Sequence, residues 1–531
     1  RVIRDITRSN FAELPVIIKY EGAGDGDEVY GSTVTCGLNS LLWKTYSRLD
    51  NRSLCPYDDP FEEFDVRSTI DSQTRILDVK SLLKKGRIQI DTDSQKSILA
   101  EQVDVIIDLG NFPLSREFYG LSSNGVWTGS TCSDSKPLCG PPGFQEVLQN
   151  SNTTELTVQA LYPQESRDRI IYRSWTATDR YSVKGNRSKV YWKLAGAIAR
   201  NLRRLHESGA EALEMDSAPA VVVESGPRNS LPGNIQMLRF IPSLALRRAK
   251  LWFRNQIHKE QWILAYNFGD TPVIERDLGE LNYMEPPQGK FWADPFPIQV
   301  EGDYYIFFEE FLYEAMKAHI SVTKIDPSGS WSEPVKVLER DYHLSYPFLF
   351  EWEGALYMIP ETKGNKAIEL YRCTEFPLKW KFEKILIKDV LAVDSTLLEK
   401  DGVWWLFCNI GGKDFASNDE LHIFYSDTPL GPWTPHKRNP VKSDVRSCRP
   451  AGRLFYRNGA LLRPAQDCSE RMGGAMCLNR VTLFDKEDYR EETVLRIEPN
   501  WIKGLHGVHT LNTVGKLTMM DCFRYIRKSS I

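Results

Sequence analysis

The sequence predicts two folded domains: a five-bladed β-propeller over residues 261–531 and, before it, an α/β domain over residues 1–212. A chain of 531 residues is longer than a single hydrophobic core usually supports. Strand-like and helical runs alternate in the first part, whereas the second part repeats one strand–glycine–strand pattern five times. Residues 213–260 between them are expected to form a linker and an amphipathic helix.

The N-terminal domain shows the alternation of an open α/β sheet. Residues 16–20 and 103–109 have the composition of strands, and residues 189–206 that of a helix. Residues 22–27 are rich in glycine but lack the last glycine of a dinucleotide-binding fingerprint, so we interpret them as a turn. The pair Asp91-Thr-Asp93 has the pattern of a metal-binding acidic pair, but such short patterns also arise by chance.

The segment between the domains is first irregular and then amphipathic. Residues 213–234 are rich in proline, glycine and serine, which is typical of a domain boundary. Residues 235–259 combine leucine, isoleucine and tryptophan with arginine and lysine. A basic amphipathic helix of this kind can make peripheral contact with an anionic membrane, or it can pack the two domains together with its basic face in water.

The propeller prediction depends on five copies of an apolar strand, a turn centred on glycine and a second apolar or aromatic strand. The turn glycines lie at positions 302, 354, 402, 459 and 515, and their spacing matches the length of a four-stranded blade. The last copy lacks outer strands, so residues 262–266 are expected to supply a closing strand. Five in-register copies favour this fold over a β-sandwich.

Polar residues recur at fixed places in these copies. Eight residues before the turn glycine lie Asp294, Tyr346 and Asp394, while Arg449 and His509 lie near that place in the last two copies. Because the innermost strands of a propeller line a central channel, these side chains are expected to meet in one funnel. The positions seven residues after the glycine are also polar, namely Glu309, Glu361, Asn409 and Gln466.

Carboxyl groups on different blades of one funnel suit glycoside chemistry. Cleavage needs one carboxylic acid to protonate the leaving oxygen and one carboxylate that attacks or activates water. The alternative interpretation is that Asp294 caps a turn before Pro295, and that Glu309 and Glu361 pair with lysine or arginine outside the channel.

The motif Phe291-Trp-Ala-Asp-Pro-Phe296, with Ile359-Pro-Glu361 and Val393-Asp394, resembles the five-bladed propellers of glycoside hydrolase families 43 and 32. With residues 446–454, 463–467 and 507–511 it more closely resembles the N-terminal propeller region of plant glucosamine inositolphosphorylceramide transferases. The hydrolase resemblance implies that Asp294 is the general base, that Asp394 tunes pKa values and that Glu361 is the general acid. We expect the substrate to be bound by Trp292, Glu309, Tyr346, Arg449, Gln466 and His509.

The N-terminal domain has a resemblance of its own. Residues 124–127, 139–147 and 191–198 resemble the formyltransferase fold that bacterial relatives join to the same propeller. Formyl transfer there depends on a histidine a few residues after an asparagine, whereas the first histidine of this chain is His206. We therefore expect a Rossmann-type, formyltransferase-like domain with a binding or structural role and without a folate-type formyl donor.

Cysteines and glycosylation sequons indicate the secretory pathway. Cys36 and Cys55, Cys132 and Cys139, and Cys448 with Cys468 or Cys477 are close enough in sequence to pair. These features predict a disulfide-bonded glycoprotein of the lumen, either Golgi or extracellular, whose N-terminal anchor precedes this numbering. The three sequons are at Asn51, Asn152 and Asn186.

The leading hypothesis is a carbohydrate-active enzyme that cleaves or transfers a glycosyl residue of an oligosaccharide or glycolipid at the funnel, with no metal or other cofactor. The alternative is a non-catalytic sugar-binding module that accompanies a glycosyltransferase. A net charge of −4 gives no electrostatic footprint for nucleic acid. Hydrolysis and transfer can use the same carboxylate pair, so the sequence does not separate them.

Overall fold

The chain divides into two compact units, Arg1–Ala249 (unit 1) and Lys250–Ile531 (unit 2). The division falls inside helix α6 (Asn234–Ile257). Among the helices described, none is both long and apolar enough to cross a membrane. The computed structural model describes residues 1–21, 38–51, 60, 65–84, 87–110, 113–131, 141–213, 216–219, 231–269, 278–412 and 416–528.

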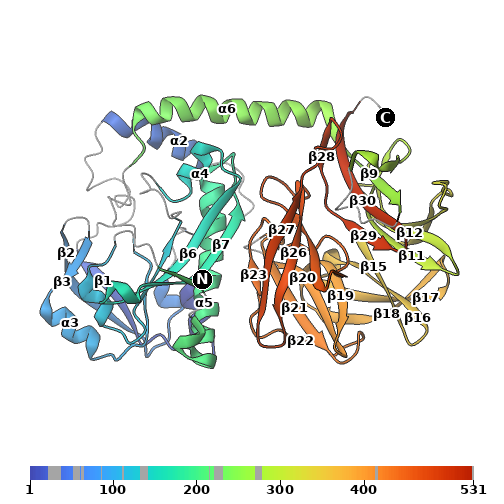
Figure 1. Ribbon diagram of the computed structural model, residues 1–531. Coiled ribbons are helices and arrows are strands. Elements are labelled where there is room, and N and C mark those ends of the chain that lie inside the picture. The colour runs from blue at the N-terminus through green and yellow to red at the C-terminus, as the bar shows by residue number, and fades with distance from the viewer. Residues whose placement is uncertain are drawn as a thin grey trace. The chain divides into compact units, whose positions relative to one another are not determined.

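Unit 2 contains five antiparallel sheets in succession, and this arrangement fits a five-bladed propeller (Figure 1). Each of the first four sheets is made of strands that follow one another in sequence. The strands of these four blades are β11 (Lys290–Val300), β12 (Asp303–Leu312), β13 (Lys317–Ile325) and β14 (Val335–Leu338); β15 (Ser345–Trp352), β16 (Ala355–Glu361), β17 (Ala367–Glu375) and β18 (Lys379–Lys388); β19 (Leu391–Lys400), β20 (Val403–Gly411), β21 (Glu420–Ser426), β22 (Thr434–Pro435) and β23 (Lys442–Ser443); and β24 (Phe455–Arg457), β25 (Ala460–Asp467), β26 (Ala475–Phe484) and β27 (Tyr489–Ile497).

The glycine of each repeat copy lies in a two-residue turn between neighbouring strands. In the first four copies both turn residues have positive φ, as in Glu301-Gly302 and Asn458-Gly459. This is the type I′ geometry, whose twist matches that of antiparallel strands and which glycine adopts without a steric penalty. The turns therefore fix the register of each hairpin, for example by pairing Val300 with Asp303.

The fifth blade is closed by a strand from the other end of the unit. Strand β9 (His258–Phe268) pairs along its whole length with β30 (Leu517–Arg527). Strands β28 (Leu505–Gly507) and β29 (Leu511–Val514) pair with the other edge of β30, and β10 (Asn282–Met284) extends the sheet beyond β9. The prediction that residues 262–266 supply a closing strand is thus confirmed.

The hydrophobic core of unit 2 lies between neighbouring blades. Each cluster joins side chains of adjacent sheets, which is how blades with two apolar faces bury both of them. Examples are Phe307 with Phe348, Trp405 with Leu454, Met476 with Met520, and Leu264 with Trp292.

Unit 1 contains two mixed sheets rather than a Rossmann-type parallel sheet. Only β1 pairs with β2, and β4 with β5, in parallel; the other described strand pairs are antiparallel. The expected Rossmann-type pattern is therefore corrected, because strands β6 and β7 form a hairpin instead of a helical crossover. The strands are β1 (Val16–Glu21), β2 (Arg75–Lys84), β3 (Arg87–Ile90), β4 (Ile106–Asp108), β5 (Val126–Ser130), β6 (Thr153–Leu161), β7 (Arg169–Ala177) and β8 (Asp216–Pro219).

The longest helix of unit 1 covers the second sheet. Helix α5 (Val183–Ser208) begins at Ser182, whose hydroxyl accepts the N–H of Gly185. Its buried side packs Val190 and Ile198 against β6. The other α-helices of the unit are α1 (Val2–Thr7), α2 (Leu41–Asn51), α3 (Thr92–Leu99) and α4 (Phe144–Gln149).

The structure shows the roles of two single residues, and at one of them it corrects the expectation of a glycan. Asn186 is fully buried and donates its amide to the carbonyl of Gly143 and the hydroxyl of Thr154, so it cannot carry a glycan. Asp91 accepts the N–H of Ser94 at the start of α3, which makes it a helix cap rather than a metal ligand.

The described cysteines are free thiols, and the expected pairing of Cys448 with Cys468 or Cys477 is wrong. Their sulfur atoms have separate hydrogen-bond partners: the Cys448 sulfur accepts the N–H of Asp444, whereas the Cys477 thiol donates to the carbonyl of Arg446. The other expected pairs, Cys36 with Cys55 and Cys132 with Cys139, lie outside the described residues.

Candidate functional site

Three equivalent positions of the propeller share an unusual backbone. Asp294, Tyr346 and Asp394 have φ angles of 50°, 46° and 53°, in the left-handed region that residues other than glycine rarely adopt. Each lies in a β-bulge on the first strand of its blade. A bulge changes the direction of a side chain. Residues with strained backbone angles occur most often at functional sites. The common geometry therefore makes these positions candidates for function.

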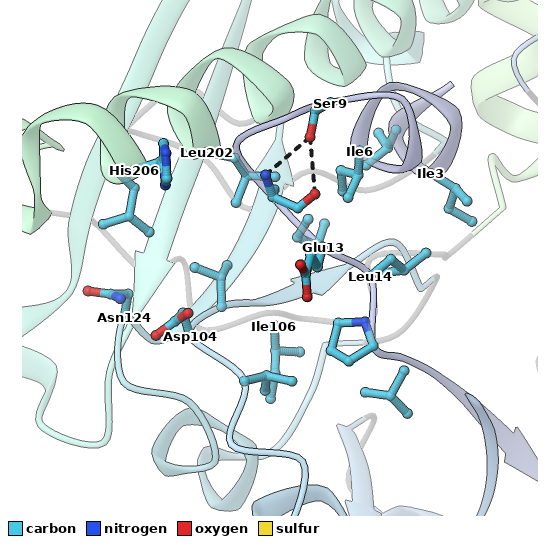
Figure 2. Close-up of a pocket in the computed structure, with 18 of the residues that line it drawn as sticks. Ile3, Ile6, Ser9, Glu13, Leu14, Asp104, Ile106, Asn124, Leu202 and His206 are labelled. Atoms are coloured by element: carbon cyan, nitrogen blue, oxygen red, sulfur yellow. Dashed lines mark hydrogen bonds between the residues drawn. The ribbon is translucent and has the colours of Figure 1, made fainter. Parts of the chain in front are cut away.

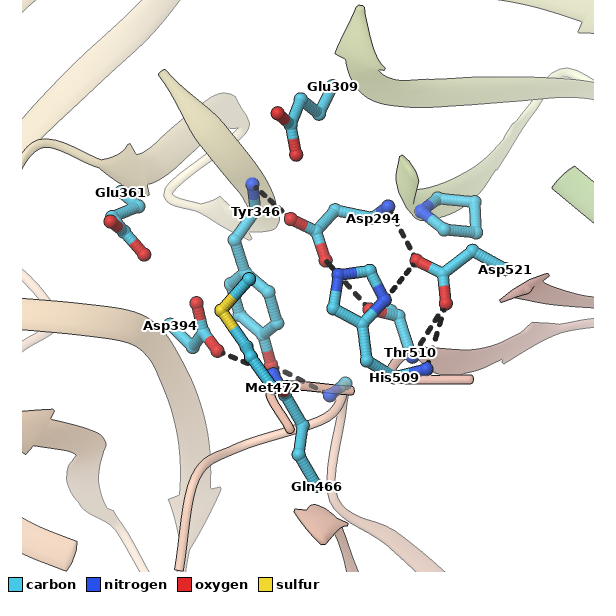
Figure 3. A network of polar contacts seen from close by, with 12 residues as sticks. Asp294, Glu309, Tyr346, Glu361, Asp394, Gln466, Met472, His509, Thr510 and Asp521 are labelled. Atoms are coloured by element: carbon cyan, nitrogen blue, oxygen red, sulfur yellow. Dashed lines mark hydrogen bonds and ion pairs between the residues drawn. The ribbon is translucent and has the colours of Figure 1, made fainter. Parts of the chain in front are cut away.

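Asp294 lies at the end of a chain of ion pairs that runs through His509 to Asp521 (Figure 3). Its two carboxylate oxygens accept the hydroxyl of Thr510 at 2.7 Å and the backbone N–H of Tyr346 at 3.1 Å. The His509 ring lies between two carboxylates, with Nδ1 2.7 Å from Asp521 and Nε2 3.5 Å from Asp294. Asp521 also accepts the backbone N–H of Asp294 at 2.8 Å. Asp521 thus supports both the ring of His509 and the strained backbone of Asp294.

Burial and charge shift the protonation of this chain in opposite directions. Burial, with the nearby Asp394 and Asp521 carboxylates, raises the pKa of Asp294 to about 6, although His509 opposes the shift. Burial lowers the pKa of His509, but the Asp521 and Asp294 carboxylates outweigh it and raise that pKa to about 9. At neutral pH, Asp294 is therefore mostly ionised beside a cationic imidazole.

The second half of the site is an arginine that holds Asp394. Arg449 Nε and Nη2 donate to the two oxygens of Asp394 at 2.6 and 3.2 Å, and the amide of Gln466 donates to the same carboxylate at 2.8 Å. Two-point contacts of this kind fix an arginine and a carboxylate in one plane. The remaining nitrogen of Arg449 donates to Asn418 and to the sulfur of Met472. Asp394 is therefore a fixed negative charge.

Two glutamates of the funnel have raised pKa values. Glu361 Oε2 lies 3.6 Å from Arg449 Nη2 and accepts no hydrogen bond from the described residues. Burial and the charge of Asp394 raise the pKa of Glu361 to about 8, against the opposing effect of Arg449. Burial and the Asp294 carboxylate also raise the pKa of Glu309 well above its usual range, and its nearest basic group is His343 at 3.4 Å. Glu361 is therefore mostly protonated at neutral pH.

Asp294, His509 and Asp521 present ligand atoms within 4.8 Å of one another, the spacing of a metal site. Their oxygens, however, already accept hydrogen bonds: Asp521 Oδ1 receives the N–H groups of His509 and Thr510, and both oxygens of Asp294 are also occupied. Donor hydrogens that point at these oxygens repel a cation, so the cluster fits a chain of ion pairs better than a metal centre.

The structure brings most of the sequence-predicted residues to one place. Figure 3 shows Glu309, Tyr346, Glu361, Asp394, Gln466 and His509 around Asp294. Tyr346 is wholly buried there; its hydroxyl contacts the Thr396 hydroxyl and accepts the N–H of Gly452, so it links three blades.

Trp292 does not join this group. Its ring packs between Phe308 and Trp331 in the core and donates to Glu310. Sequence reasoning also missed Asp521 and Thr510. Asp521 lies six residues after Gly515, one short of the spacing used to search the other copies, so a search that allowed a shorter fifth copy would have found it.

The region that contains the funnel matches a known protein family. Residues 280–510, which include every funnel residue named above except Asp521, match one family model. It describes the N-terminal region of glucosamine inositolphosphorylceramide transferase 1. The resemblance to these transferases predicted from the sequence is confirmed.

Curated relatives carry the same name. The chain is 42% identical over 260 residues to glucosamine inositolphosphorylceramide transferase 1 of Oryza sativa subsp. japonica, and 41% identical to that of Arabidopsis thaliana. The alignments cover 47% and 44% of this chain but only 33% and 34% of the relatives. The chain therefore spans about a third of the length of the relatives it matches.

Solved structures give only distant similarity. Zg3597, a family 117 glycoside hydrolase produced by Zobellia galactanivorans, is 13% identical, with 50% of this chain and 90% of that chain covered and a TM-score of 0.33. The family 43 protein BlXynB of Bacillus licheniformis is 19% identical, with 42% of this chain and 47% of that chain covered and a TM-score of 0.31. These scores are too low to carry an argument, and the fold of unit 2 rests on the strand pairing described above.

Unit 1 contains a cavity of about 1170 Å³ (Figure 2). Its walls include apolar residues of α1 and α5, such as Ile6 and Leu202, and its polar lining includes Asp104, Asn124 and His206. The sequence spacing separates His206 widely from Asn124, but the fold brings both to the same cavity. The likeness of this unit to formyltransferases, and its binding or structural role, stay predictions.

Proposed function

We propose that unit 2 binds a glycan or glycolipid at the funnel and cleaves or transfers one glycosyl residue with Glu361 as the acid and Asp294 as the base. One observation carries this proposal: two carboxyl groups of the same funnel hold opposite protonation states near neutral pH, with pKa values of about 8 and about 6. Glycosyl chemistry needs this pairing of a protonated and an ionised carboxyl group.

Each residue of the network has a defined part in the proposal. Glu361 donates its proton to the leaving oxygen, and ionised Asp294 accepts a proton from water or from an acceptor hydroxyl. Asp394, held by Arg449, is a fixed negative charge that keeps Glu361 protonated. Asp521 positions Asp294 by accepting its backbone N–H, and the charge of His509 limits the rise of the Asp294 pKa.

The relatives support a carbohydrate substrate. Their name describes a transferase that acts between glucosamine and inositolphosphorylceramide, and the matched region of this chain contains Asp294, Glu361 and Asp394. Because the chain spans about a third of those proteins, both a glycolipid substrate and a transfer reaction are part of the proposal for this chain.

The test compares the full chain with two funnel variants on a panel of aryl glycosides and glycosylated inositol phospholipids. Asp294→Asn removes the charge but keeps a residue that tolerates positive φ, so the backbone should persist. We expect Asp294→Asn and Glu361→Gln each to lower turnover by about 10² or more. Exposed carboxyl groups of the same types give the controls, Asp427→Asn and Glu383→Gln, which should keep wild-type turnover.

Two further results distinguish the roles. An aryl leaving group of low pKa should partly rescue Glu361→Gln but not Asp294→Asn, because only the first variant lacks the proton donor. The rate of the wild type should fall below pH about 6 and above pH about 8, where Asp294 gains and Glu361 loses its proton. Full activity of Asp294→Asn on a substrate that the wild type converts would refute the proposal.

A non-catalytic sugar-binding module is the second candidate. Its support is the burial of the funnel acids: Asp294 and Asp394 are only 4% and 1% exposed. In that case calorimetry should detect sugar binding by the wild type without turnover, and Asp294→Asn should weaken the binding itself.

A further inference from the structure

Helix α6 has two apolar sides, and only one of them is covered. Met237, Phe240 and Leu244, spaced three and four residues apart, are buried in a cluster that includes Trp43 and Phe144 of unit 1. This spacing defines one face of a helix. The packing of that face explains why the helix is stable, but it leaves the rest of its apolar residues without a role.

The other apolar side of α6 faces solvent. Ile235 and Leu238 are 75% and 63% exposed, and Leu246, Trp252 and Phe253 are each 57% exposed. With Pro242 and Ala249, both also exposed, the residues at 235, 238, 242, 246, 249 and 253 repeat every three or four positions and form a continuous stripe along the helix. A contiguous exposed apolar patch of this kind marks a binding surface rather than ordinary surface composition. We call these residues, with Trp252, the α6 stripe.

The charges of α6 are all of one sign. The helix contains five basic residues and no aspartate or glutamate. Two of them face unit 1: Arg247 donates to Asn150, and Arg248 donates to the Tyr181 carbonyl and pairs with Asp50. Arg239 and Lys250 are exposed, and each lies four residues after a member of the α6 stripe, so they flank it.

We propose that the α6 stripe lies on an anionic lipid bilayer surface. An interfacial helix needs an apolar face with tryptophan, phenylalanine or leucine, basic residues beside it, and enough charge to prevent it from spanning the bilayer. The stripe supplies the apolar face, and Arg239 and Lys250 meet the phosphate and carboxylate groups of anionic headgroups. Trp252 and Phe253 are the rings expected at the boundary between headgroups and acyl chains.

Charge favours this partner over a protein surface. A helix without acidic residues, and with basic groups beside its apolar face, is complementary in charge to a negatively charged sheet of lipid. The proposal concerns α6 alone and does not depend on the chemistry of the funnel. If both hold, the membrane contact would keep the chain at the surface on which a glycolipid is presented.

The test is co-sedimentation of the full chain with phosphatidylcholine vesicles, with and without phosphatidylserine. The apolar variant combines Leu246→Gln, Trp252→Gln and Phe253→Gln; its matched control combines Phe382→Gln, Val494→Gln and Leu495→Gln, which are exposed on outer strands of unit 2. The basic variant combines Arg239→Gln with Lys250→Gln, and its control combines Arg372→Gln with Lys381→Gln. Circular dichroism checks that each variant is folded.

We expect the wild type to bind the phosphatidylserine vesicles more tightly than phosphatidylcholine alone, and the apolar variant to lose about tenfold or more of that binding. Each basic residue is worth roughly fivefold at an anionic surface, so the basic variant should lose about tenfold or more, and added salt should remove the difference. Both controls should bind as the wild type does.

Three results would overturn the proposal. The first is equal binding of the wild type to both kinds of vesicle, and the second is wild-type binding by the apolar variant. The third is a concentration-dependent dimer in sedimentation velocity that the apolar variant abolishes while vesicle binding is absent, which would assign the stripe to a second copy of the chain.

Discussion

Replacing Glu361 by glutamine should stabilise unit 2, and the gain should depend on pH. The Oε2 atom of Glu361 is buried and accepts no hydrogen bond from the described residues. Its pKa is about 8 in the folded protein, against an ordinary value of 4.5. Because the folded state raises the pKa of an acid, stability is lost as pH rises from 4.5 through 8, where the unfolded chain ionises more readily than the folded one.

The size of the effect follows from the two pKa values. A difference of roughly 3.5 pKa units, at about 1.4 kcal/mol per unit, means that Glu361 lowers the free energy of unfolding above pH 8 by at most about 5 kcal/mol. Glutamine has the same shape and no charge to desolvate, so Glu361→Gln should recover a large part of this free energy. The variant and the wild type should have similar stability at pH 4.5 and diverge steadily up to pH 8.

Urea denaturation at a series of pH values measures this difference. Hydrogen exchange of peptides from β16 and β19, followed by mass spectrometry, assigns the transition to unit 2. Glu383→Gln, an exposed substitution of the same type, should change the free energy of unfolding little at any pH. If Glu361 were instead an ionised partner of Arg449, Glu361→Gln would destabilise the protein at high pH, and that result would refute the reasoning.

Three other predictions follow from the described contacts. Asp294→Val should destabilise unit 2 by about 2 kcal/mol more than Asp294→Asn in urea denaturation, because a β-branched residue fits poorly at a φ of 50° whereas asparagine tolerates it. Arg449→Met should lower the free energy of unfolding by about 3–5 kcal/mol, because it leaves Asp394 buried without its cation. Adding Asp394→Asn to the same chain should restore much of that free energy. If the effects of the two substitutions were simply additive, the pairing would be contradicted. Peptide mapping of protein from a secretory host should find no glycan at Asn186, which is buried, and a glycan there would mean that α5 is packed differently.

The repeat in the sequence predicted both the fold of unit 2 and the positions of many funnel residues. Each turn glycine fixes a hairpin register, so residues at a constant distance from it occupy the same place in every blade. Asp294, Tyr346 and Asp394 follow this rule, and each has the same bulged backbone conformation in its own blade. Trp292 was expected at the site only because it belongs to the motif around Asp294, and its ring lies in the core instead.

The sequence was less informative about unit 1 and about α6. Strand-like runs carry no sign of direction, so the hairpin of β6 and β7 could not be distinguished from a parallel crossover. The burial of Asn186 was open to prediction, since helical spacing places it on the same face as Val183 and Val190. In α6, the amphipathic pattern was recognised, but which of its apolar sides is covered depends on contacts with α2 and α4 that are distant in sequence.

The pairing of β9 with β30 has a consequence for how the protein is made. Strand β9 leaves the ribosome before every other strand of unit 2, yet its partner is the last strand of the unit to be synthesised. An apolar strand with an open edge must therefore wait while four blades are translated, and unpaired edges are where nascent chains aggregate. A chain that stops shortly before Leu517 would leave this edge of β9 permanently unpaired, so we expect it to be insoluble rather than slightly weakened.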